Sequence, residues 1–160
     1  MNILDIVLVI LVVSVMALET KRGFGRAIFD FVGLLIAVRI VALIVPKVTE
    51  SARFASDAPA NEAIWYAILF VLVGGILLLL GKMAYDSTLI SLDLFDPFLG
   101  GVLGCGVAVI IGHAIVRGLA ISTSMASGVP DILANSTLGM EFYQFETYHE
   151  VIEFLSSLAA

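Results

Sequence analysis

Four long stretches of apolar residues constrain this chain more than any other feature of its sequence. They cover residues 3–18, 27–45, 63–80 and 98–121. A helix of about 20 mostly apolar residues crosses the roughly 30 Å hydrocarbon core of a bilayer. Helix is the only conformation open to a single span, because lipid offers no partner to unpaired backbone groups. The sequence therefore predicts four transmembrane helices, and we expect the second to end at Pro46.

The composition agrees with a membrane chain and excludes several soluble classes. Of the 160 residues, 61% are hydrophobic and 14% are charged, and the mean hydropathy is +1.11. Soluble domains are about 45–50% apolar and about 25% charged. Fourteen acidic residues against eight basic ones give a net charge of −6, whereas nucleic-acid binding needs a basic surface. We expect an all-α integral membrane protein whose partner is the lipid bilayer and that binds no nucleic acid.

The part of the chain that follows the spans has a different pattern. We predict a four-helix transmembrane domain over residues 1–121, and an extracytoplasmic loop and amphipathic helix over residues 122–160. Between residues 138 and 158, apolar side chains share one side of a helix and glutamates share the other. Because this polar face is acidic, we expect the helix to pack on the bundle or on a partner, with anchoring in the membrane interface as an equal alternative.

The distribution of lysine and arginine among the loops predicts the orientation. The first and third loops carry four such residues, the second loop carries two, and the segment after the last span carries none. Short cytoplasmic loops are enriched in these residues. We therefore expect both termini to lie outside the cytoplasm.

Ionisable residues within or beside the spans fall into two layers, because alternate spans run in opposite directions. The intramembrane polar cluster comprises Asp5, Arg39, His113 and Arg117. The cytoplasmic-side polar cluster comprises Arg22, Arg26, Asp30 and Lys82. A charge at the bilayer centre costs about 2.5–3.5 kcal/mol on insertion scales, so such residues find partners or face water.

Opposite charges within each layer are expected to pair. In the first layer, we predict that Asp5 pairs with Arg39 or Arg117. In the second layer, we predict that Asp30 pairs with Arg26 of the first loop or with Lys82 of the third loop. Asp30 and Arg39 are nine residues apart, so they project from opposite sides of one helix and do not pair with each other. The first interpretation is that these pairs position the helices, and the alternative is an ion or proton path.

Small residues recur every fourth position along the fourth span and predict close helix packing. They are Gly100, Gly104, Ala108 and Gly112. Small residues allow helix backbones to approach closely, which favours association inside a membrane. The stripe is typical of packing within one chain, with an interface between copies of the chain and a pore-facing helix as the two alternatives.

Signatures of catalysis and of metal binding are weak. His149 and Glu150 begin like the helix of a zinc protease, but the second histidine of that motif is missing. Ser127 with His113 is a poor match to an intramembrane serine protease, because the serine lies in a predicted loop. We therefore expect a non-enzymatic protein with no metal and no cofactor.

Three short motifs resemble a known family. The chain opens with Asn-Ile-Leu-Asp-Ile at residues 2–6, continues with Arg-Gly-Phe-Gly-Arg at residues 22–26, and enters its last span with Asp-Pro-Phe-Leu-Gly-Gly-Val-Leu-Gly at residues 96–104. Together, in this order and spacing, they resemble the colicin V production (CvpA) family. The chain departs from that pattern at Ala27, where relatives usually carry an acid, and at Pro97, where they commonly carry a base.

The resemblance implies a bacterial inner-membrane protein that has four spans and no catalytic chemistry in its membrane part. It also implies a role in the production or export of a peptide toxin and in envelope homeostasis. We expect the chain to act through helix–helix assembly, by self-association or with other membrane proteins. The alternative function is a small channel or transporter, in which the intramembrane polar cluster lines a water path and His113 titrates near neutral pH.

Overall fold

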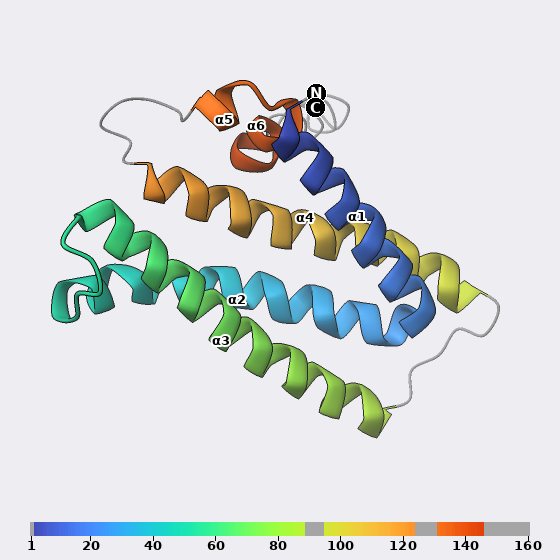
Figure 1. Ribbon diagram of the computed structural model, residues 1–160. Helices are drawn as coiled ribbons and strands as arrows, with labels where there is room; N and C mark the ends of the chain where they lie inside the picture. The colour runs from blue at the N-terminus through green and yellow to red at the C-terminus, as the bar shows by residue number, and fades with distance from the viewer. Residues whose placement is uncertain (1, 89–94, 124–130, 146–160) are drawn as a thin grey trace, which may run out of the picture.

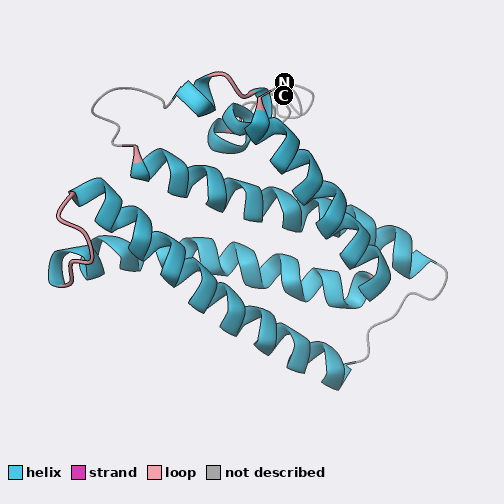
Figure 2. Ribbon diagram, viewed as in Figure 1, coloured by secondary structure: helices cyan, strands magenta, loops and turns pink. Residues whose placement is uncertain are grey.

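The computed structural model describes residues 2–88, 95–123 and 131–145, and these residues are helical apart from short connections (Figure 2). The long helices are α1 (Ile3–Arg22), α2 (Phe24–Ser51), α3 (Ala58–Thr88) and α4 (Asp96–Ser122). Two short helices follow, α5 (Asp131–Ala134) and α6 (Thr137–Gln144). Each long helix is long and apolar enough to cross a membrane. The predicted class, an all-α multi-pass membrane protein, is therefore confirmed.

Helix α4 lies at the centre of the bundle. Figure 1 shows it between α1 and α2, whereas α3 crosses α2 and packs on α4 near its own beginning, where Tyr66 lies against Ala114. Half of the most apolar window of α4 is buried inside the protein, whereas only 11% of the corresponding window of α3 is buried. Helix α4 therefore supplies the interior of the bundle, and α3 has most of its surface turned outward.

The outward surfaces of the helices are apolar. Val7 and Ile10 of α1 are 50% and 59% exposed, and Val71 and Leu79 of α3 are 71% and 64% exposed. Continuous apolar surface of this kind is unfavourable in water, but it is the normal surface of a helix in lipid. The exposed faces of α1 and α3 therefore agree with a bundle surrounded by acyl chains.

Helix α2 is longer than the sequence pattern predicted. It continues through Pro46 and ends at Ser51, so the prediction that Pro46 ends the helix is wrong. Proline removes only its own N–H donor from the helical ladder, and membrane helices tolerate this loss when water or neighbouring groups satisfy the freed carbonyl. The second connection is correspondingly short, because α3 already begins at Ala58.

The connection between α1 and α2 consists of Gly23 alone. Its φ of 83° lies in the left-handed region, which glycine adopts without steric cost. Its N–H donates to the carbonyl oxygen of Glu19 at 2.9 Å, and its own carbonyl accepts from the N–H of Ala27 at 3.0 Å. This one-residue turn places the last turn of α1 directly beside the first turns of α2.

The amphipathic helix predicted over residues 138–158 is interrupted. Helix α6 ends at Gln144, and Phe145 follows with a φ of 53° and a ψ of 40°. A left-handed residue cannot continue a right-handed helix, so the prediction of one uninterrupted helix is wrong. Residues 146–158 of that prediction lie outside the described residues. Within α6, Phe142 is buried against Leu4 and Leu8 of α1, so this part of the segment packs on the bundle.

Candidate functional site

The polar side chains of the bundle gather at its two ends. We name the end at which α1 and α3 begin the Asp5 end, and the end at which α2 and α4 begin the Asp30 end. Antiparallel packing brings together residues that are far apart in the sequence, such as Arg26 of α2 and Leu78 of α3. The two ends differ in how their charges are satisfied.

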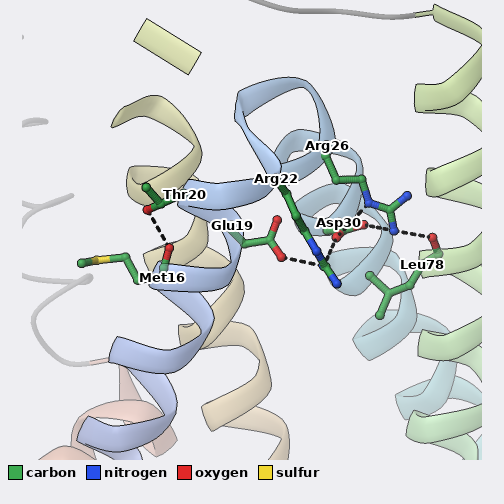
Figure 3. Close-up of polar contacts among 7 residues, drawn as sticks. All are labelled: Met16, Glu19, Thr20, Arg22, Arg26, Asp30 and Leu78. Carbon is green, nitrogen blue, oxygen red and sulfur yellow. Dashed lines mark hydrogen bonds and ion pairs between the residues drawn. The ribbon is translucent and has the colours of Figure 1, made fainter. Parts of the chain in front are cut away.

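At the Asp30 end, two buried acids and two arginines form a network, shown in Figure 3, in which the side chain of Arg26 is 12% exposed and that of Arg22 is 41% exposed. Glu19 and Asp30 are 2% and 1% exposed. Arg22 bridges them, because its Nη1 lies 2.9 Å from Oε1 of Glu19 and 3.0 Å from Oδ2 of Asp30. The four formal charges sum to zero. Pairing with opposite charges offsets part of the free-energy cost of burying the two carboxylates.

Arg26 completes this network and ties it to a third helix. Its Nη2 lies 3.0 Å from Oδ1 of Asp30, and its Nε donates to Oδ2 at 3.2 Å. The same Nη2 donates to the carbonyl oxygen of Leu78 on α3 at 3.0 Å. A planar guanidinium can hold a carboxylate and a carbonyl together, which a single ammonium does less well. The network therefore joins α1, α2 and α3.

The predicted pair of Asp30 with Arg26 is confirmed, and the alternative partner Lys82 is not used. Lys82 instead lines an open pocket of about 330 Å³ together with Arg22, Arg26 and Asp86. Asp30 and Arg39 do not pair with each other, as predicted from their spacing.

Sequence reasoning missed Glu19 as a member of this network. The first span was predicted to end at Leu18, which placed Glu19 in a solvated loop. In the structure, α1 continues to Arg22 and the next turn is a single residue, so Glu19 becomes a buried helical side chain. Its spacing of three residues from Arg22 was the available signal, because such residues share one helix face.

At the Asp5 end, the predicted partner of Asp5 is wrong. Neither Arg39 nor Arg117 contacts it. Its Oδ1 accepts hydrogen bonds from the hydroxyl of Ser136 at 2.6 Å and from the N–H of Leu138 at 3.1 Å. Asp5 therefore satisfies its charge with donors at the start of α6, which the sequence pattern treated as a separate region.

The Asp5 contact joins the beginning of the chain to the segment after the last span. The N–H of Asn2 donates to Oδ2 of Asp5 at 2.9 Å, which is half of a helix-capping arrangement. The hydroxyl of Ser136 also accepts the N–H of Gly139 at 2.9 Å and so caps α6. Asp5 is thus the point at which α1 and α6 are held together.

The other three members of the intramembrane polar cluster meet in one place. Arg39 of α2 and His113 and Arg117 of α4 line a pocket of about 350 Å³, which Phe145 also borders. His113 is held there by its Nδ1, which lies 2.7 Å from the carbonyl oxygen of Phe142. Within the part of the chain that the structure describes, neither arginine makes an ion pair.

The stripe of small residues on α4 is occupied by α1 of the same chain. A Cβ atom on Gly100 would lie 2.7 Å from the carbonyl oxygen of Glu19, and one on Gly104 would lie 3.0 Å from the Cα of Met16. Ala108 is completely buried. At Gly112 the space is filled by the ring of Phe142. Of the three interpretations of the stripe, packing within the chain is the one that the structure supports.

These features define a multi-pass α-helical membrane protein that is held together by a glycine-packed helix pair and by buried ion pairs. The chain belongs to the colicin V production protein family, because the model of that family matches residues 4–144. The matched range contains the spanning helices and both short helices. This membership confirms the resemblance seen in the sequence and supports a role in colicin V production. No curated protein and no solved structure matches the chain.

Proposed function

We propose that this chain is a non-enzymatic inner-membrane protein that supports the production or export of a colicin V type peptide toxin and contributes to envelope homeostasis. Both termini lie outside the cytoplasm in this proposal, following the lysine and arginine distribution of the loops. The single observation that carries it is the family match, which covers the bundle from α1 to α6.

Helix–helix assembly in this proposal begins inside the chain. The small-residue stripe already packs on α1, so contacts with a second copy or with other membrane proteins would use the outward faces of the bundle. The ion pairs at the Asp30 end and the close contact of the small-residue stripe with α1 fix the helices to one another. These contacts support the role of a rigid scaffold rather than that of an enzyme.

Deletion and complementation in a toxin-producing bacterium test this function. We expect deletion of the gene to lower the amount of secreted toxin, and the native chain to restore it. Gly104→Val should restore it poorly, because a Cβ atom there already meets the backbone of α1, whereas a Cβ atom at Gly75 meets nothing within 4 Å and Gly75→Val should restore it fully. Unchanged toxin secretion after deletion would overturn the proposal.

A small anion-conducting channel is the second candidate function. The observation that favours it is the pocket lined by Arg39, His113 and Arg117, because two arginines that make no ion pair with any described residue would attract an anion into the membrane region. Purified protein in liposomes should be tested for chloride flux against protein-free liposomes. The scaffold proposal expects equal flux in both, and flux that is lost in Arg39→Gln would favour the channel.

A further inference from the structure

Two arginines in the half of the bundle nearer to the Asp5 end have no acidic partner among the residues that the structure describes. Arg39 and Arg117 are both exposed and line the same pocket. Among the described residues that line the pocket, none is acidic. Because an isolated charge is costly at membrane depth, paired or hydrated arginines are the rule there. The pocket therefore favours the binding of an anion, because the described residues of the chain place no acidic side chain in it.

We propose that this pocket binds the phosphate group of an anionic phospholipid. Arginine is the preferred residue for phosphate, because its guanidinium offers several N–H donors in a fixed plane. His113 lines the same pocket as the two arginines and is fixed in place by its contact with Phe142. The proposal stands apart from the role in toxin production and does not depend on it.

The depth of the pocket fits a lipid head group. Arg117 precedes Ser122, the last residue of α4, by five residues, or about 7.5 Å at 1.5 Å per residue, and Arg39 precedes Val45, where the apolar stretch of α2 ends, by six residues, or about 9 Å. Lipid phosphates lie in the interfacial layer just outside the hydrocarbon core. The long arginine side chain can reach this layer from within the core.

The surroundings of the pocket favour a lipid over a soluble anion. Leu35, Val38 and Ile110 form its apolar wall. The neighbouring surface of α2 is also apolar, since Leu35 and Leu43 are 45% and 72% exposed. A phospholipid can place its phosphate between the arginines and its acyl chains over this surface, whereas a soluble anion would gain nothing from the apolar wall.

Native mass spectrometry of the detergent-purified full chain with added phosphatidylglycerol tests the proposal. We expect the native chain to retain one phosphatidylglycerol molecule, and the Arg39→Gln/Arg117→Gln double variant to bind it at least about tenfold more weakly. Arg53→Gln is the matched control, because it removes an exposed arginine in the connection between α2 and α3. It should bind like the native chain.

Two further measurements complete the test. Thermal unfolding of each variant verifies folding, and Arg117→Gln alone replaces the double variant if that one does not fold. Inorganic phosphate is added as a competitor. Failure of phosphate to displace the lipid supports the proposal. Equal lipid binding by the native chain and the variants overturns it, as does displacement by phosphate at the concentration of the lipid, which would indicate a soluble-anion site.

Discussion

At the scale of single residues, the bundle depends on a few buried carboxylates that are satisfied in different ways. Asp30 is held by two arginines, whereas Asp5 is held by a hydroxyl and by backbone N–H groups. The first arrangement balances charge with charge, and the second spreads one charge over several dipoles. Both avoid the cost of an unpartnered carboxylate in a water-poor site.

Replacement of Asp30 should be strongly destabilising. Asp30→Asn leaves Arg22 and Arg26 without their shared carboxylate, and loss of one partner from a buried pair costs about 3–5 kcal/mol. Denaturant unfolding in detergent micelles measures the effect. Asp86→Asn is the control, because Asp86 is an exposed carboxylate at the same end of the bundle. Equal stability of the two variants would show that the network contributes nothing to the fold.

Loss of the Ser136 hydroxyl should weaken the attachment of α6. In Ser136→Ala, Asp5 loses its shortest hydrogen bond and α6 loses its N-terminal cap, at a combined cost of about 1–3 kcal/mol. Hydrogen exchange of the α6 amides measures this directly, and we expect faster exchange there than in the native chain. Ser122→Ala, at an exposed site, should leave that exchange unchanged. Unaltered exchange in Ser136→Ala would refute the anchor.

At the scale of elements, the fit between α1 and α4 depends on the glycines of α4. A methyl group added at Gly104 would lie 2.8 Å from the Cβ of Glu19, closer than real carbon atoms approach. Gly104→Ala should therefore destabilise the bundle by about 1–3 kcal/mol through overpacking. Gly75→Ala in α3 is the matched control, because its methyl group meets nothing within 4 Å.

Unfolding of both glycine variants in detergent provides the comparison. We expect Gly75→Ala to stay within about 0.5 kcal/mol of the native chain, as surface substitutions usually do. If Gly104→Ala were as stable as Gly75→Ala, the α1–α4 contact would not be close-packed.

The same elements show what the sequence could and could not predict. Hydropathy alone located the spanning helices, because lipid permits no other backbone conformation for such segments. Helix ends were less predictable, since Pro46 is tolerated and Gly23 turns the chain within one residue. The antiparallel order of the spans placed Asp30 and Arg26 in the same layer and so identified their pair. The partner of Asp5 was missed because Ser136 lies 131 residues away, and no periodicity within one span connects them.

At the scale of the whole molecule, the protein is an asymmetric bundle with a sealed interior and a lipid-facing exterior. Its single cysteine lies on the exterior. Cys105 is exposed and lines an apolar groove between α1 and α4, beside Met16 and Phe98. Ala108, one turn further along α4, is fully buried in the small-residue stripe. The two positions are three residues apart and lie on neighbouring parts of the helix surface, Cys105 at the exposed edge and Ala108 in the buried stripe.

Thiol labelling at these two positions, in protein reconstituted into lipid, tests the sealed bundle most directly. We expect native Cys105 to react with a lipid-soluble maleimide and to resist a membrane-impermeant one. Ala108→Cys in a Cys105→Ser background should resist both reagents until the protein is denatured. Rapid reaction of the cysteine at position 108 with the impermeant reagent would show that water reaches the small-residue stripe. That result would contradict a bundle in which α1 covers this stripe.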